Sequence, residues 1–516
     1  MAPGAGASPE ERETPMTTGT DPHALHEQPV IVGAGVAGLM TALHFGNRPC
    51  VLVSCAEQPG IGALRSGVAA ALGADDTASA RAGRTLERAA GLACLETVQC
   101  ITAAMGNVID TLGRFGIPVA AGARDSGYAL HAALLAAVHV RPNVTILAPA
   151  ALRRLVVVDG HVRGVILDTG SRMIPLDTDA VILASGGTCG LYDDGLSPVT
   201  AIGRSLAVAA RAGAALSDLE LVHFHPFALS LGNTPGSGVA IPFELYGPDA
   251  ILHDEQGQKL EGHTNDPAYV ARAIYERRAG GHAVFLDLRK IVAAGTQNAD
   301  PTLKSFLALC HARGIDPATQ SLPVRPAAAF HIGGLKTEIS GRTSLPGLWA
   351  CGEAACNGFH GASVLHGNPL LEAVVCSRFA AEDVTGRMPV PFRDISGIHP
   401  DQSLTKGLLP VVRKSMAAAM APTRTEETLV SALMHVSRFA EYDDVALVAE
   451  LMFLSALKRN ESRGAHFRAD FPKPDAIARH TSFTATEAHT AVRLVGRDHP
   501  ITWSPDAPTK TELFTT

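Results

Sequence analysis

Three glycines near the start of the chain have the spacing of a phosphate-binding turn. Gly33, Gly35 and Gly38 form the pattern G-x-G-x-x-G, directly after an apolar run of strand type at residues 29–32. The first glycine of such a pattern permits a tight turn, the second lets the backbone approach a pyrophosphate, and the third lets a helix lie close to the strand. The first turn of that helix offers N–H groups and the positive end of its dipole to the phosphates. The chemistry indicated is therefore binding of a dinucleotide.

The elements that must hold this turn are present on both sides of it. A helical run covers residues 39–45, and a second apolar strand covers residues 50–54. Together with the first strand they form the β-α-β unit that the pattern requires and that a chance glycine-rich turn would lack. A later strand of buried type ends in Gly186 and Gly187, as expected where a chain turns sharply beside a cofactor.

Changes in composition divide the chain into four parts. Residues 1–28 are rich in Pro, Gly, Thr and charge and lack the apolar core of a signal peptide, so we expect a disordered extension. Strand-then-glycine patterns predict a Rossmann-like α/β domain at residues 29–222 and again at 333–385. The stretch between them, 223–332, is rich in His, Pro and Gly and predicts an inserted α+β capping or substrate domain. Residues 400–480 have helical periodicity and predict a C-terminal helical bundle.

Within these parts, three finer predictions concern secondary structure. Periodicity predicts helical structure at residues 85–115 and a helix at 369–381. The last thirty or so residues are expected to be irregular.

The composition of the whole chain excludes several classes of partner. With 516 residues, 46% hydrophobic and 18% charged, the chain has the length and composition of a globular protein with a large core. A net charge of −7 without a basic cluster argues against a nucleic-acid partner, and no apolar run reaches the ~18 residues of a membrane span. Nine cysteines without a C-x-x-C pair indicate neither a disulfide framework nor a metal site. We therefore expect a cytoplasmic protein with reduced thiols and a small-molecule substrate.

Five groups of short motifs agree in order and spacing with one known family. They are Gly33-x-Gly35-x-x-Gly38, Ala184-Ser185-Gly186-Gly187, Phe224-His225-Pro226, Gly352-Glu353 with His360-Gly361-Ala362, and Glu461-Ser462-Arg463-Gly464-Ala465-His466. Over residues 29–475 the chain therefore resembles the succinate dehydrogenase/fumarate reductase flavoprotein family. The run Asn368-Pro369-Leu370-Leu371-Glu372 resembles the L-aspartate oxidase branch of that family. The resemblance implies an FAD-dependent oxidoreductase with an FAD-binding domain, a capping domain and a helical C-terminal domain.

The resemblance also implies which residues bind FAD. The glycines and their neighbours would line the pyrophosphate, a glutamate would accept a hydrogen bond from the ribityl chain, and a helix N-terminus would stabilise negative charge on the reduced flavin. The implied residues are Gly33, Ala34, Gly35, Val36, Ala37, Gly38, Ser54, Ser66, Gly67, Gly186, Gly187, Glu353, Pro369 and Leu370. Ser54 stands where a carboxylate for the adenosine ribose is expected, and Ser66 and Gly67 would approach the flavin ring. The histidine that binds flavin covalently in part of the family has no match, so non-covalent FAD is expected.

The substrate-binding positions of the family are changed in this chain. The family's proton-transferring arginine corresponds to Pro267, its second substrate histidine to Ala329, and its carboxylate-binding arginine to Val364. A dicarboxylate in a dry site needs bidentate, charge-assisted contacts, and these three residues provide none. We therefore expect a pocket that is less cationic and more apolar. A genuine L-aspartate oxidase would need substitute cations at these positions, for which Arg65 and Arg204 are the candidates.

Three residues are candidates for substrate contact or proton transfer. His225 matches a substrate histidine of the family, and its alternative role is to fix the local turn. Glu244 lies one position from a family glutamate, and its alternative is a solvated carboxylate of the capping domain. His331 lies two positions beyond Ala329, so on a regular strand its side chain would project to the same side; its alternative is a packing role.

Three functions remain open from the sequence. The first is an FAD-dependent oxidase or dehydrogenase that moves a hydride from a small amine or amino-acid-like substrate to flavin N5, with O2 or another acceptor for the electrons. The second is a genuine L-aspartate oxidase, which converts aspartate to iminoaspartate for NAD biosynthesis. The third is a flavin-binding protein without turnover. The changed pocket favours the first.

Overall fold

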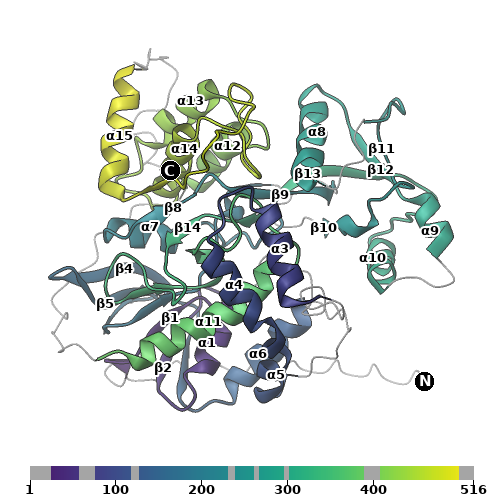
Figure 1. Cartoon of the computed structure of the whole chain (residues 1–516). Coiled ribbons are helices and arrows are strands. Elements are labelled where there is room, and N and C mark those ends of the chain that lie inside the picture. Colours follow the sequence, from purple (N-terminus) through teal and green to yellow (C-terminus); the bar gives the residue numbers. More distant parts are fainter. Residues whose placement is uncertain are drawn as a thin grey trace, which may run out of the picture.

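A parallel five-stranded sheet organises the first part of the molecule (Figure 1). The computed structural model describes residues 25–56, 76–117, 127–193, 195–230, 239–260, 266–295, 301–388 and 407–498. The strands lie in the order β15-β7-β1-β2-β3, and they are Leu348–Ala350 (β15), Val181–Leu183 (β7), Val30–Val32 (β1), Cys50–Val53 (β2) and Val144–Leu147 (β3). Every residue of the first four is buried, which explains their uninterrupted apolar sequences.

Helices cover one face of this sheet. α1 (Val36–His44) packs against α11 (Asn368–Gly386) and α6 (Gly127–His139). Ile31 and Ile182 of the sheet belong to the same apolar core as these helices, and the neighbouring strand residues belong to a second core on the other face. The alternation of side chains along each strand therefore divides the sheet between two cores.

The run predicted as helical at residues 85–115 is divided into shorter elements. They are α3 (Ala78–Arg88), α4 (Leu95–Ala103), a 3-10 helix (Ala104–Asn107) and α5 (Val108–Arg114). Ala90 and Gly91 have φ angles of 50° and 83°, a left-handed conformation that ends a right-handed helix. The region is therefore mostly helical, as predicted, but it is not one continuous helix, because the chain turns after Arg88.

Two smaller sheets surround the parallel one. The antiparallel sheet β4-β5-β6 consists of Ala151–Val158, His161–Asp168 and Met173–Asp177. The sheet β16-β14-β8-β17 consists of Ala355–Cys356, Gly334–Lys336, Leu216–Ser217 and Ser482–Phe483. Because β17 comes from the last described part of the chain, this second sheet ties the C-terminal region to the remainder of the fold.

An antiparallel layer with its own apolar core lies at the upper right of Figure 1. Its sheet has the order β10-β9-β13-β12-β11, with strands Val239–Ala240, Val222–Leu229, Leu322–His331, Val284–Asp287 and Ile251–Asp254. Its helices are α8 (Pro267–Ala279), α9 (Arg289–Gly295) and α10 (Pro301–His311). Phe227, Ile274 and Phe306 are among the buried side chains that hold these elements together.

The C-terminal region is helical. It contains α12 (Leu409–Ala419), α13 (Glu426–Val436), α14 (Asp444–Lys458) and α15 (Ala485–Asp498), with α14 packed against α7 (Arg204–Arg211). The irregular structure expected for the last thirty or so residues is a wrong prediction where the structure describes them, since α15 extends to Asp498. A capping box starts α15: Thr484 N donates to Glu487 Oε2 at 2.7 Å, and Glu487 N donates to Thr484 Oγ1 at 3.4 Å.

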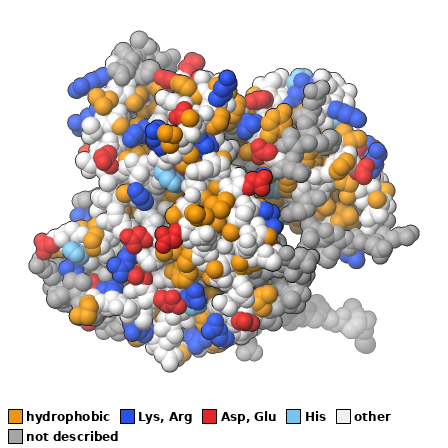
Figure 2. All heavy atoms as spheres, in the orientation of Figure 1, with side chains coloured by type: hydrophobic (Ala, Val, Ile, Leu, Met, Phe, Trp, Pro, Cys, Tyr) orange, Lys and Arg blue, Asp and Glu red, His pale blue; other side chains and the backbone are white. Residues whose placement is uncertain are grey.

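The fold class is α/β, as predicted, with a Rossmann-like sheet, an antiparallel α+β layer and a C-terminal helical bundle. In the part of the chain that the structure describes, no helix has both the length and the apolar content needed to cross a lipid bilayer. On the face shown in Figure 2, the coloured Lys and Arg side chains are interspersed with Asp and Glu.

Candidate active site

The carboxyl end of β1 carries the glycine turn. Gly33 has φ 114°, and its N–H donates to Val53 O at 2.8 Å, which joins the turn to β2. A Cβ atom at Gly38 would lie 1.8 Å from Gly33 O, so no larger residue fits where α1 meets the strand. Among the described residues, no atom lies within 4 Å of a Cβ built at Gly35. The turn therefore excludes side chains on its inner side and leaves space beside Gly35, as a bound pyrophosphate requires.

The first turn of α1 is oriented for an anion. Gly35 is the N-cap and has no side chain with which to cap the helix. The first intrahelical hydrogen bond joins Leu39 N to Gly35 O at 3.0 Å, so the N–H groups of Val36 and Ala37 precede the helical ladder. The ring of His131 bonds to Ala34 O at 2.9 Å and fixes the peptide before the N-cap. These contacts fit the phosphate role expected of residues 34–37.

A buried carboxyl group lies after β15. The Glu353 Oε1 atom accepts a hydrogen bond from His331 N at 2.9 Å, and a Cβ atom at Gly187 would lie 2.7 Å from the same oxygen. Burial raises the pKa of Glu353 to about 7, against the hydrogen bonds from the His331 and Gly187 backbone that favour its ionised form. Gly186 beside it has φ 76° and, among the described residues, no atom within 4 Å of a built Cβ. A carboxyl group that titrates near neutrality can bond to a ligand hydroxyl as donor or acceptor.

The N-terminus of α11 is a second helix start without a capping side chain. Its N-cap is Gly367, with φ 82°, and Pro369 and Leu370 belong to its first turn. Asn368 is fully buried and anchors this turn, since its Oδ1 accepts from Arg81 Nε at 2.9 Å. The position of this helix start in a 19-residue helix packed on α1 fits the flavin role expected of Pro369 and Leu370.

The remaining residues expected near the cofactor, or as substitute cations, are Ser54, Arg65, Ser66, Gly67 and Arg204. The Oγ atom of Ser54 donates to Ala56 O at 2.9 Å and closes the local turn after β2. Ser66, Gly67 and Arg65 lie outside the described residues. Arg204 is the first residue of α7, and burial lowers the pKa of its guanidinium.

His225 lies on β9 with a defined tautomer. It pairs with Ala327 of β13, and its Nδ1 accepts a hydrogen bond from Phe227 N at 3.1 Å. Because Nδ1 is the acceptor, the neutral ring carries its proton at Nε2. His223 lies two residues earlier on the same strand, so both imidazoles are on one face of β9. Sequence reasoning missed His223, although the His-x-His spacing on a strand is a readable signal.

His331 is placed in the protein interior. Its side chain has no exposed surface, its Nε2 lies 3.2 Å from Leu219 O, and burial lowers its pKa to about 4. Phe224 pairs with Ala328 but His223 pairs with Phe330, so Ala329 is the extra residue of a β-bulge. The regular alternation on which the prediction for His331 depended is thus broken, and its surroundings are those of a packing residue.

Glu244 is the third candidate for substrate contact, and Pro267, Ala329 and Val364 stand at the family's changed substrate positions. Glu244 belongs to a 3-10 helix, Phe243–Leu245, and its side chain lies outside what the structure describes. Pro267 starts α8 beside the N-cap Asp266, whose Oδ1 accepts from Ala268 N at 3.0 Å. Ala329 packs with the buried side chains Leu196, Ala228 and Ala327. Val364 packs with the buried side chains Leu92, Leu221, Phe330, Ile332, Ala362 and Ala465.

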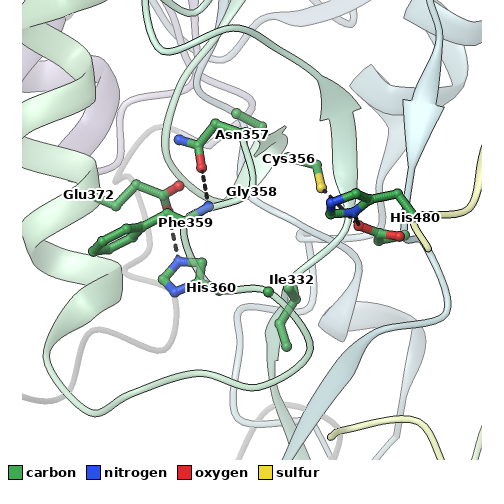
Figure 3. Close-up of a pocket in the computed structure, with 11 residues that line it drawn as sticks. Ile332, Cys356, Asn357, Gly358, Phe359, His360, Glu372 and His480 are labelled. Atoms are coloured by element: carbon green, nitrogen blue, oxygen red, sulfur yellow. Dashed lines mark hydrogen bonds and ion pairs between the residues drawn. The ribbon is translucent and has the colours of Figure 1, made fainter. Parts of the chain in front are cut away.

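A buried imidazole–carboxylate pair lies close to this apolar cluster. The Nε2 atom of His360 is 3.0 Å from Glu372 Oε2, and the ring of Phe330 meets His360 edge-on at 5.1 Å between centroids. Figure 3 shows His360 and Glu372 facing each other on one side of a small pocket, with Cys356 and His480 on the other side. The pocket has room for about one water molecule. It is therefore too small to be the substrate site.

Comparisons with known proteins agree with this geometry. The family described as FAD binding domain matches residues 119–370, and the family described as Fumarate reductase flavoprotein C-term matches residues 434–511. A protein named L-aspartate oxidase from Mesorhizobium japonicum is 37% identical over 92% of this chain and 98% of its own length. Another of that name from Xylella fastidiosa (strain Temecula1) is 36% identical over 86% of this chain and 92% of its own length.

Solved structures show the same fold at lower identity. A variant of the Escherichia coli quinol fumarate reductase chain FrdA has a TM-score of 0.72 and 22% identity, covering 89% of this chain and 94% of that chain. The Mycobacterium smegmatis Sdh1 complex has a TM-score of 0.71 and 20% identity, with the same coverage. At these identities the two likenesses show the fold alone.

Proposed function

Because this chain belongs to the succinate dehydrogenase/fumarate reductase flavoprotein family and is an FAD-dependent oxidoreductase, we propose that it oxidises the α-amino group of an amino acid, with L-aspartate as the first candidate. The observation that carries this proposal is the similarity, over nearly the whole chain, to relatives named L-aspartate oxidase. The reaction removes a hydride from the α-carbon and a proton from the amino group, so that a C–N single bond becomes an imine. When bound, FAD accepts the hydride and passes the electrons to O2 or another acceptor.

We assign the following contributions to this chain's own residues, and the site geometry supports them. The first turn of α1, with Gly35 as its N-cap, would hold the pyrophosphate, and Glu353 would bond to a hydroxyl of the cofactor chain. The start of α11, with its positive dipole end, would stabilise negative charge on the reduced flavin. His225 holds a proton at Nε2, where it can donate to a substrate carbonyl or carboxylate oxygen.

A second candidate function is favoured by the packing of the changed positions. Ala329 and Val364 are buried in apolar clusters, and Pro267 starts a helix. Pro267 and Val364 stand where the family resemblance expects an arginine, and Ala329 stands where it expects a histidine. These observations favour an amino acid or amine with fewer carboxylates than aspartate, oxidised by the same hydride removal.

Anaerobic mixing of the flavin-loaded protein with a panel of substrates tests both candidates. The panel contains aspartate, asparagine, an apolar amino acid and the matching amines, and the absorbance of the flavin at about 450 nm is followed. Bleaching by aspartate, with peroxide release when O2 is admitted, supports the first candidate. Bleaching by the less acidic compounds alone supports the second. Stable oxidised flavin with every compound overturns both and leaves the non-catalytic alternative.

A further inference from the structure

α3 is joined along its length to the segment that contains Val364. Near its start, Arg81 Nε donates to Asn368 Oδ1 at 2.9 Å, and Arg81 Nη2 donates to His366 O at 2.8 Å. One turn later, Asn368 Nδ2 donates to Thr85 Oγ1 at 3.0 Å. Arg81, Thr85 and Asn368 are all buried, so these bonds fix the helix against residues 366–368.

The other end of α3 is fixed against the same segment. Ala362 N donates to Ala89 O at 2.9 Å, directly after the last residue of the helix. A Cβ atom at Gly361 would lie 2.5 Å from Ala89 Cβ, so the two backbones are in close contact. α3 therefore runs beside residues 361–368 with one face turned to them along its whole length.

Arg88 belongs to that face. Residues 81, 85 and 88 are spaced i, i+4 and i+7, which places them on one side of a helix. Along the helix, Arg88 lies between Thr85, which bonds to Asn368, and Ala89, which bonds to Ala362. The residues of the facing segment at the same height are therefore 363–365. Arg88 thus lies level with Val364, the position where the family resemblance expects an arginine.

Electrostatics agree with this placement. Burial lowers the pKa of His223 to about 4, and the positive charge of Arg88 is the next largest cause of the lowering. The guanidinium is therefore close to the face of β9 that carries His223 and His225. The side chains around Val364 are apolar and buried, so a charge-assisted bond made there is weakly screened.

We propose that Arg88 binds a carboxylate of the substrate and replaces, from a different element, the arginine that position 364 lacks. The proposal rests on the proposed function, since it requires a substrate that carries a carboxylate. A planar guanidinium can bind a carboxylate through two parallel hydrogen bonds, which a lysine ammonium cannot reproduce. Arg88 is thus a specificity-determining residue that admits acids with their carboxylate at the α3 side of the site.

Binding of a non-reacting carboxylate separates this assignment from turnover. Succinate, and succinamide as its uncharged analogue, are titrated into the flavin-loaded wild type and into the variants Arg88→Gln, Arg88→Lys and Arg84→Gln, with the flavin absorbance change as readout. Arg84 is the control because it lies on the same helix, is half-exposed and pairs with Asp76. Flavin content and thermal midpoint are measured for each variant, and kcat and KM are measured for the best substrate.

The expected result is a loss of succinate affinity of about 30-fold in Arg88→Gln, a smaller loss in Arg88→Lys and none in Arg84→Gln. Succinamide should bind equally to all four proteins, and KM should rise more than kcat falls. Equal succinate affinity in wild type and in both Arg88 variants would overturn the assignment and leave amino-acid oxidation intact. A wild type that neither binds succinate nor oxidises any carboxylate-bearing amine would overturn the proposed function and the assignment together.

Discussion

The glycine turn and the region around Val364 are built on opposite principles. In the glycine turn the backbone makes the site: Gly38 has no room for a side chain, and Gly35 has free space beside it among the described residues. Around Val364 the side chains make the site, and an apolar cluster occupies a position where the family resemblance expects a cation. Binding by backbone geometry tolerates few changes of residue, whereas binding by side chains can be rebuilt from a neighbouring element.

Gly38→Ala should have the largest effect on this comparison. The added Cβ would lie 1.8 Å from Gly33 O, which backbone atoms cannot accommodate without moving α1 away from β1. The expected cost is more than about 3 kcal/mol of folding free energy, although alanine normally stabilises a helix relative to glycine. Chemical denaturation of the flavin-free protein measures it, with Gly83→Ala as the control, because Gly83 lies in α3 and, among the described residues, no atom lies within 4 Å of a Cβ built there. A stable Gly38→Ala protein with normal flavin content would contradict the geometry of the turn.

Val364→Arg tests the other side of the comparison. The substitution restores the expected residue type but buries a guanidinium beside Leu92, Leu221 and Phe330. We expect a loss of about 3 kcal/mol in unfolding free energy, because the charge lacks hydrogen-bonding partners in that cluster. Val364→Thr, with nearly the same volume, should cost about 1 kcal/mol and serves as the control. If Val364→Arg leaves the free energy of unfolding unchanged, water or a polar group reaches the cluster around Val364. The glycine turn and this cluster would then differ less than their packing indicates.

The sequence predicted the first region better than the second for a physical reason. The turn at Gly33, the strand before it and the helix after it are local in sequence, so their spacing is sufficient to identify them. The position of His331 depends on a β-bulge at Ala329, which has no local signal and reverses the side to which the next residues point. The nearness of Arg88 to Val364 depends on contacts between distant segments and on the chain turning at Ala90, which helical periodicity did not reveal. The domain boundaries expected at residues 223 and 332 stay predictions.

Glu353→Gln should change how stability depends on pH. The carboxyl group of Glu353 ionises near 4.5 in the unfolded chain and at about 7 in the folded protein. Between these values the folded protein retains a proton that the unfolded chain has lost, so the free energy of unfolding falls as the pH rises. The loss is complete above pH 7 and amounts to about 3 kcal/mol. The glutamine variant lacks this titration and should lose less stability than the wild type between pH 5 and pH 8, as thermal unfolding of the flavin-free proteins would show. Parallel pH profiles for the two proteins would mean that the carboxyl group is solvated.

Gly35→Ala should have the smallest effect and the most specific one. Gly35 has φ −77° and ψ −176°, which alanine adopts without strain, and among the described residues no atom lies within 4 Å of the added Cβ. The flavin-free protein should therefore unfold at the wild-type denaturant concentration. If the free space beside Gly35 holds the pyrophosphate, the methyl group displaces it from the first turn of α1, and FAD affinity should fall by about tenfold or more, which is ~1.4 kcal/mol. Fluorescence titration with FAD measures the affinity. Unchanged stability together with unchanged FAD affinity would mean that the phosphates bind elsewhere. The glycine turn would then not be a site made by the backbone, and its contrast with the region around Val364 would be lost.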